Sequence, residues 1–262
     1  MRSSLFRPAL ALALVAALAG CAGSGNKKKG VDSNRYIARD VDTLYNAAKD
    51  RLDRHDYKTA AALFDEVERQ HPYSVWARRA ELMSAFSYYL AHSYPESIQS
   101  AQRFLSIHPG NRDAPYAMYL VAVDYYEQIT DVTRDQKITQ QALDAMGDLM
   151  RRYPDSPYSA DARLKVDLIN DHLAGKEMEI GRFYQRRRDW LASTYRFRKV
   201  VDDYQQTSHV AEALMRLTES YLALGVPDEA RKSAAVLGAN YPGTDWYAHA
   251  FALIQKKEGK AG

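Results

Sequence analysis

The chain is poor in the residues that build disulfide frameworks and many-turned β structure. Among its 262 residues there is one cysteine, Cys21. An intramolecular disulfide and a cysteine-based metal cluster are therefore both excluded. The 13 glycines and 9 prolines are few for this length, which favours helices. The length and the 46% hydrophobic content suffice for one sizeable domain or an extended repeat array.

A strong excess of charge of one sign is also missing. The formal charge is +3, from 36 basic and 33 acidic residues. Arg2 and Arg7 lie in a segment that we expect to be removed, which leaves 34 basic residues against 33 acidic ones. This balance gives no reason to expect nucleic acid as a partner.

Signatures of catalysis are absent from the sequence. It contains no H-E-x-x-H metal motif, no glycine-rich phosphate loop and no G-x-S-x-G nucleophile motif. The seven histidines are scattered, and acidic pairs such as Asp202-Asp203 are typical of solvated helix faces. We therefore predict no catalytic residues, no metal ligands, no cofactor and no enzymatic activity.

Residues 1–20 have the pattern of an export signal. A basic start, Arg2 and Arg7, precedes a short apolar stretch from Pro8 to Ala19. That stretch is too short for a membrane span, which needs about 20 apolar residues. It ends in LAGC, residues 18–21, which resembles the bacterial lipoprotein box. That resemblance implies cleavage before Cys21 and acylation of this cysteine, since two or more acyl chains anchor a protein stably. An ordinary signal peptide that happens to hold a cysteine is the alternative.

The residues after Cys21 indicate a tether. Residues 22–35, AGSGNKKKGVDSNR, are small, polar and basic, without apolar periodicity. Lys27, Lys28 and Lys29 fit either a solvated linker, which we favour, or a contact with anionic lipid. By resemblance to bacterial lipoproteins, Ala22 in place of an aspartate favours the outer membrane over the inner one.

From Asp40 onward the chain repeats a pattern with spacings of 3, 4, 3 and 5 residues. The five copies are Tyr57, Ala60, Phe64, Val67, Pro72; Tyr94, Ser97, Ala101, Phe104, Pro109; Thr139, Ala142, Met146, Leu149, Pro154; Trp190, Ser193, Phe197, Val200, Gln205; and Pro227, Ala230, Ala234, Leu237, Pro242. Steps of three and four place these side chains on one helical stripe, and a proline ends the helix. An aromatic ring, as in His71 or Tyr153, precedes each terminal position.

Each stripe follows another helical segment, most clearly at 177–184, where Gly181 and Tyr184 match the tetratricopeptide pattern. The sequence thus predicts an all-α, right-handed superhelical solenoid of five tetratricopeptide repeats. We assign repeats one to three to residues 36–160 and repeats four and five to residues 161–262. A coiled coil fits badly, because the prolines interrupt any sustained heptad pattern.

Two departures mark the array. The segment EQITDVTRDQKI, residues 127–138, is longer than a normal turn within a repeat, and either a structural lid or a site could occupy it. Asp135 could cap the helix that follows. Gln205 replaces the fourth proline, which we expect to loosen the turn between repeats four and five.

Two surfaces are candidates for binding a partner. Tyrosines crowd repeats one to three, and tyrosine suits peptide contacts, although we expect more than half of them to be core residues. They are Tyr45, Tyr88, Tyr89, Tyr116, Tyr119, Tyr125 and Tyr126. Arginines crowd repeat four around Trp190, a composition typical of protein-interface anchors but also of a solvated helix face. They are Arg182, Arg186, Arg187, Arg188, Arg196 and Arg198.

The lipoprotein box, the tether and the five repeats together resemble the BamD family of outer-membrane assembly lipoproteins across essentially the whole chain. The more specific stretches are FDEVERQHPY (64–73), DVTRDQ (131–136), LAGKEMEIGRFY (173–184) and NYPGTDW (240–246). The match is of the kind seen in alphaproteobacterial members.

The resemblance implies a lipoprotein on the periplasmic face of the outer membrane, held by acyl chains on Cys21. Its implied partners are the POTRA domains of the barrel subunit BamA, further lipoproteins of the assembly complex and unfolded outer-membrane proteins. The family places the barrel subunit at the C-terminal repeats, where Arg196 matches a contact arginine and where we add Arg188 and Trp190. Unfolded clients would enter a groove of the N-terminal repeats, for which our candidates are Tyr45, Tyr88, Tyr119 and Tyr126.

Two other functions fit parts of the pattern. A tetratricopeptide lipoprotein of the Tol-Pal or peptidoglycan systems is the main alternative, although such proteins often carry an N-terminal coiled coil that is not visible here. A solenoid fused to a murein-cleaving enzyme would need a further domain, for which the repeats leave no room.

Overall fold

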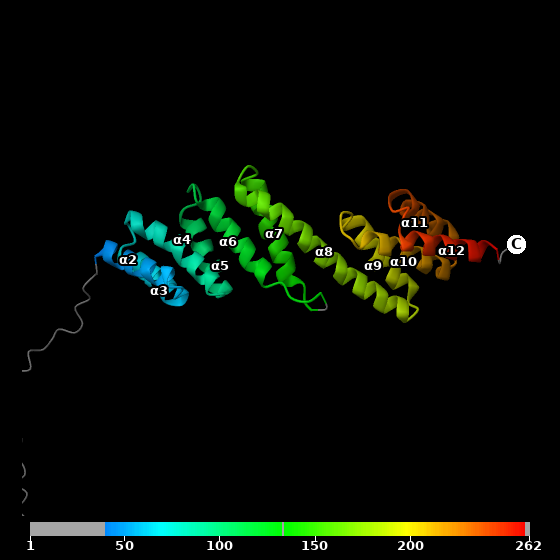
Figure 1. Ribbon diagram of the computed structural model, residues 1–262, viewed down its shortest axis with the longest axis horizontal. Helices are drawn as coiled ribbons and strands as arrows, with labels where there is room; N and C mark the ends of the chain where they lie inside the picture. The colour runs from blue at the N-terminus through cyan, green and yellow to red at the C-terminus, as the bar shows by residue number, and fades with distance from the viewer. Residues whose placement is uncertain (1–39, 133, 260–262) are drawn as a thin grey trace, which may run out of the picture. The chain divides into compact units, whose positions relative to one another are not determined.

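A computed structural model describes residues 40–132 and 134–259, and within these ranges all regular structure is α-helical (Figure 1). The predicted signal segment, Cys21 and the tether lie outside the described residues. The helices are α2 (Val41–Asp53), α3 (Tyr57–Gln70), α4 (Val75–Leu90), α5 (Tyr94–Ile107), α6 (Ala114–Glu127), α7 (Lys137–Arg152), α8 (Pro157–Arg186), α9 (Trp190–Asp203), α10 (Val210–Leu224), α11 (Pro227–Asn240) and α12 (Asp245–Glu258). The predicted all-α class is confirmed.

The helices form five consecutive pairs, α2–α3 to α10–α11, followed by α12. Each helix packs against its neighbours in the chain, and contacts between α2 and α4, α4 and α6, and α6 and α8 join the first helices of successive pairs. At the end of the array α12 packs on α10 and α11. This is the helix-turn-helix stacking of a tetratricopeptide solenoid.

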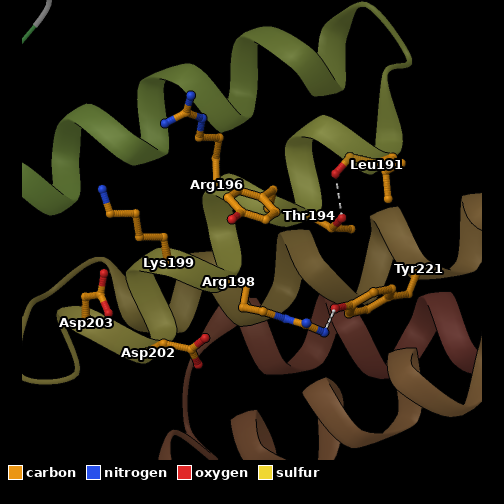
Figure 2. A pocket seen from close by; sticks show the side chains of 9 residues that line it. Leu191, Thr194, Arg196, Arg198, Lys199, Asp202, Asp203 and Tyr221 are labelled. Carbon is orange, nitrogen blue, oxygen red and sulfur yellow. Dashed lines mark hydrogen bonds between the residues drawn. The ribbon is translucent and has the colours of Figure 1, made fainter.

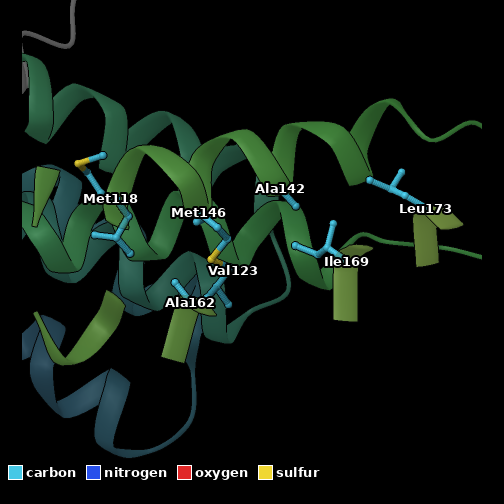
Figure 3. Packing of buried hydrophobic residues seen from close by; sticks show 9 residues of the cluster. Met118, Val123, Ala142, Met146, Ala162, Ile169 and Leu173 are labelled. Carbon is cyan, nitrogen blue, oxygen red and sulfur yellow. The ribbon is translucent and has the colours of Figure 1, made fainter. Parts of the chain in front are cut away.

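The predicted stripe lies inside the array. In all five second helices the residues at the second, third and fourth stripe positions are buried, from Ala60, Phe64 and Val67 in α3 to Ala230, Ala234 and Leu237 in α11. The small residue lets the paired helix approach, and the larger ones fill the space between pairs. In the middle of the array, Met146 and Ala142 meet Met118 and Val123 of α6 and Ile169 of α8 (Figure 3).

The junctions between repeats share one backbone conformation. The aromatic residue that ends each second helix has φ between −136° and −125° and ψ between 43° and 61°. In each case its carbonyl accepts a hydrogen bond from the backbone N–H three residues later, at 3.0–3.2 Å. Thr207 donates this bond to Tyr204 at 3.1 Å, so the turn holding Gln205 closes as the proline-containing ones do. Backbone hydrogen bonding, and not the proline alone, therefore sets the junction.

Four of the turns inside the repeats place one residue in the left-handed conformation. These residues are His55, His92, Arg188 and Gly225, with φ of 61°, 55°, 61° and 78°. The residue after each donates a backbone hydrogen bond to a carbonyl five positions earlier, as Asp189 does to Tyr184 at 3.0 Å. This is the Schellman-type ending that glycine usually occupies. Repeat three lacks it and uses the longer loop 128–136 instead.

The first helix of the fourth repeat is one continuous helix of 30 residues, α8. Its N-terminal part, with Ala162 and Ile169, belongs to the core built on α6 and α7. Its C-terminal part, with Ala174 and Met178, belongs to the core built on α9 and α10. The predicted boundary between repeats three and four, at residue 160, falls near the start of this helix. The helix contributes to the cores on both sides of that boundary.

Candidate functional site

The arginines of repeat four separate into two groups in the structure. Three of them are tied to neighbouring helices. Arg182 donates to Glu212 of α10 at 3.0 Å, Arg196 to Glu177 of α8 at 3.0 Å, and Arg198 to the hydroxyl of Tyr221 at 2.6 Å. The other three, Arg186–Arg188, lie at the end of α8 and on the turn that follows it, and they do not line the pocket that holds Arg196. The sequence cluster is therefore two different surfaces.

The first surface is a pocket of about 660 Å³ on α9 (Figure 2). It is lined by Leu191, Thr194, Tyr195, Arg196, Arg198, Lys199, Asp202, Asp203 and Tyr221. Figure 2 shows Arg198 reaching across to Tyr221, while Arg196 and Lys199 extend from the same helix in another direction. The pocket thus combines three cations with two carboxylates and an apolar wall.

A buried carboxylate holds two of these cations in place. Glu177 of α8 is almost fully buried, and it accepts hydrogen bonds from Arg196 at 3.0 Å and from Lys199 at 2.8 Å. The hydrogen bond to Glu177 raises the pKa of Lys199. A guanidinium has five N–H donors in a planar fork, so Arg196 keeps further donors for a carboxylate of a partner. Glu177 therefore positions Arg196 and leaves some of its N–H donors available for a partner.

Two large apolar side chains beside this pocket face solvent. Leu191 is 73% exposed and Tyr195 is 78% exposed, one helical turn apart on α9. Exposed apolar groups next to fixed cations are typical of a protein-binding surface. Neither residue was predicted from the sequence. Their positions outside the buried stripe were a signal that could have identified them.

The other two residues that we assigned to the partner side have local structural roles. Trp190 is half-buried and opens α9, and Asp189 before it accepts a hydrogen bond from the N–H of Ala192 at 3.3 Å. Arg188 takes the left-handed position of the turn, and its side chain is exposed. Neither of the two lines the α9 pocket as described. Their part in binding stays a prediction.

The long loop of repeat three packs beside the same region. Arg134, Asp135 and Gln136 of the loop line a second pocket of about 510 Å³, whose far side holds Glu177 and Lys199. Asp135 accepts a hydrogen bond from the first N–H of α7, on Lys137, at 3.3 Å. This is the capping role that we considered for it. The loop therefore lies where repeats three and four share α8.

The four tyrosines proposed for a client groove lie in different environments. Tyr45 is only 8% exposed and packs edge-on against Phe64. Tyr88 donates to Asp65 at 2.9 Å, and burial raises its pKa to about 12. Tyr119 donates to Asp161 at 2.5 Å, and Tyr126 lies under the ammonium of Lys165 at 5.5 Å. Each of them holds helices together, so their role in client binding stays a prediction.

The N-terminal repeats instead open at a groove of about 850 Å³ between α4 and the junction that precedes α6. Its lining includes Trp76, Leu82 and Met83 together with the exposed residues Arg78, Arg79 and Arg112. The sequence pattern did not indicate this site, because Arg78 and Arg79 come from a helix that carries few recognisable repeat positions.

Within the described residues, histidine, cysteine and acidic side chains do not gather in a way that could hold a metal ion. No helix in that part of the chain is both long and apolar enough to span a bilayer.

Comparison with known proteins places these features in a family. The sequence matches the family described as "YfiO: Outer membrane lipoprotein" over residues 38–237. It is 49% identical to the outer membrane protein assembly factor BamD of Caulobacter vibrioides, over 95% of this chain and 81% of that protein. It is 45% identical to the BamD of Rickettsia prowazekii, over 88% of this chain and 92% of that protein. Among solved structures, a thermophilic tetratricopeptide protein of Thermus thermophilus matches 81% of this chain and 100% of its own, with 18% identity and a TM-score of 0.39.

Proposed function

Since the chain belongs to the alphaproteobacterial branch of the BamD family and is an outer-membrane protein assembly factor, we propose that it acts as a non-enzymatic scaffold for barrel assembly. Its C-terminal repeats bind the POTRA domains of the barrel subunit BamA, and its N-terminal repeats receive unfolded outer-membrane proteins. Acyl chains on Cys21 hold it on the periplasmic face of the outer membrane, beside further lipoproteins of the complex. Family membership favours this role over one in the Tol-Pal or peptidoglycan systems.

The observation that carries the POTRA contact is the α9 surface. Arg196 and Lys199 are oriented by the buried Glu177, and Leu191 and Tyr195 stand exposed beside them. A POTRA surface that offers a carboxylate to Arg196 and an apolar patch to Tyr195 satisfies both halves of this site. Fixed cations are pre-organised, so less side-chain entropy is lost on binding.

Arg196 itself is a poor probe, because a glutamate there would face the buried carboxylate of Glu177. Tyr195→Ser is cleaner, since the side chain is largely exposed and its loss leaves the core intact. We expect this change to weaken binding to the purified POTRA domains at least tenfold, as interface aromatics often contribute about 2 kcal/mol. Isothermal titration calorimetry measures the effect.

Tyr73→Ser is the matched control, because Tyr73 is another exposed tyrosine but lies between α3 and α4. It should bind the POTRA domains like the unchanged chain. Equal affinities for the Tyr195 variant and the unchanged chain would remove α9 from the interface.

Receipt of clients is supported by the groove beside α4. Trp76, Leu82 and Met83 offer an apolar floor, and Arg78, Arg79 and Arg112 offer charge for an anionic group. An extended segment with an aromatic end and a free C-terminal carboxylate matches both features. Arg79→Gln should lower the cross-linking yield of such a client peptide. With a peptide amidated at its C-terminus, the Arg79→Gln variant and the unchanged chain should give equal yields.

A further inference from the structure

Three adjacent arginines stand without a counter-charge at the turn between α8 and α9. Arg186, Arg187 and Arg188 are all exposed, and within the described residues none of their guanidinium groups makes an ion pair or a hydrogen bond. Two acidic residues close to this turn already have hydrogen-bond partners. Asp189 caps α9, and Glu219 accepts hydrogen bonds from Gln185 and Arg216. The turn is therefore a local concentration of positive charge that no carboxylate pairs with.

Apolar side chains flank these arginines. Phe183 is 47% exposed, and the guanidinium of Arg187 lies 5.4 Å from the centre of its ring. The turn between α10 and α11 lies beside this one, because Gln185 near the end of α8 donates to Glu219 near the end of α10 at 2.9 Å. That neighbouring turn exposes Leu224 and Val226. We call Phe183, Arg186–Arg188, Leu224 and Val226 the basic turn patch.

We propose that the basic turn patch docks on an anionic lipid surface, which gives this chain a second membrane contact besides its predicted acyl anchor. A guanidinium binds phosphate through two parallel hydrogen bonds, and an aromatic ring beside it suits the boundary between headgroups and acyl chains. The patch lies at the ends of α8 and α10 and on the turns that follow them. The proposal depends on the membrane attachment in the proposed function, since the chain must be held near lipid.

The test uses residues 39–262, which form a compact unit whose hydrophobic clusters all come from its own helices and which lacks Cys21. Its sedimentation is measured with vesicles of phosphatidylcholine alone and with vesicles containing phosphatidylglycerol. We expect binding to the anionic vesicles only, and less of it as salt increases. Arg186→Gln with Arg187→Gln should weaken it roughly thirtyfold at low ionic strength, since each arginine near a charged bilayer contributes a factor of about five.

Two matched variants control for charge and for folding. Arg151→Gln with Arg152→Gln removes the same charge from two adjacent exposed arginines at the end of α7, and its binding should stay close to that of the unchanged chain. Phe183→Ser keeps the charge and should still weaken binding. Failure of the unchanged chain to sediment with anionic vesicles, or an equal loss in both arginine pairs, would overturn the proposal.

Titration of the same variants with POTRA domains separates this inference from the proposed function. If Arg186→Gln with Arg187→Gln reduced POTRA affinity and left vesicle binding unchanged, the patch would be a protein contact and the lipid proposal would be wrong. If POTRA binding failed in every chain while vesicle binding followed the pattern above, the lipid contact would stand and the proposed function would need revision.

Discussion

Two glycines in the middle of helices should respond to the same substitution with opposite signs. Gly181 of α8 faces Phe197 of α9, and a Cβ atom added there would lie 2.4 Å from Cε1 of the ring and 2.8 Å from Cδ1 and Cζ. Gly147 of α7 has one neighbour, the flexible end of Arg151 at 3.5 Å. Alanine in place of a helical glycine stabilises a helix by about 1 kcal/mol when nothing opposes it.

The ring of Phe197 cannot move away cheaply. It is fully buried, and Met178 and Leu217 belong to the same cluster around it. Overpacking of this kind costs about 1–3 kcal/mol, which exceeds the gain in helix propensity. We therefore expect Gly181→Ala to lower the unfolding free energy by up to about 2 kcal/mol and Gly147→Ala to raise it by up to about 1 kcal/mol.

Urea denaturation followed by circular dichroism measures both changes. Combining Gly181→Ala with Phe197→Leu provides an internal check, because the smaller side chain makes room for the new methyl group. The double variant should then lose less than the sum of the two single losses. Stabilisation by Gly181→Ala equal to that by Gly147→Ala would refute the close approach of α8 and α9.

Two further outcomes follow from the turns and from a buried acid. Arg188→Gly should leave the unfolding free energy unchanged or raise it by up to about 1 kcal/mol, because glycine adopts the left-handed conformation freely. Gly225→Ala should lower it by about 1 kcal/mol, because alanine is strained in this backbone conformation although nothing lies near the added methyl group. Thermal melts of the two variants check both predictions. Asp124 is fully buried and neither of its carboxylate oxygens has a hydrogen-bond partner, so burial raises its pKa from 3.8 to about 7. The folded chain then holds a proton that the unfolded chain has lost between pH 4 and 7, and this residue's contribution to stability falls as the pH rises through that window. Asp124→Asn should raise stability by at least about 1 kcal/mol at pH 8 and by less at pH 5, and denaturation at the two pH values would contradict this if the gain were equal at both.

The repeat pattern was sufficient for the fold because the stripe residues are spaced by helix geometry alone. Ala142, Met146 and Leu149 had to lie on one face of a helix, and the structure buries all three. The continuous α8 was harder to predict, since the ordinary helix formers around residue 165 leave no sign of whether the helix breaks there. Its length is set by packing against α7 on one side and α9 on the other.

The site was less predictable than the fold. Clustering of arginines in the sequence suggested one surface. In the structure, Arg188 occupies the left-handed position of a turn, whereas Arg196 donates a hydrogen bond to Glu177 of the preceding helix. That pairing joins residues 19 apart in the sequence, and no local pattern reports it. The environment of the tyrosines was unpredictable for a related reason. The sequence does not distinguish a half-buried tyrosine that donates to an aspartate from an exposed one.

The single helix shared by repeats three and four also determines how the array can come apart. In most solenoids each repeat is a separable unit, and unfolding can stop at any boundary. Here the same 30-residue helix, α8, completes two cores. Unfolding of either core therefore unfolds part of the helix on which the other core packs. Hydrogen exchange should therefore show α6 to α11 opening as one cooperative block, with separable losses confined to the first repeats and to α12. If both contacts of the proposed function form, the least divisible segment of the array lies between them.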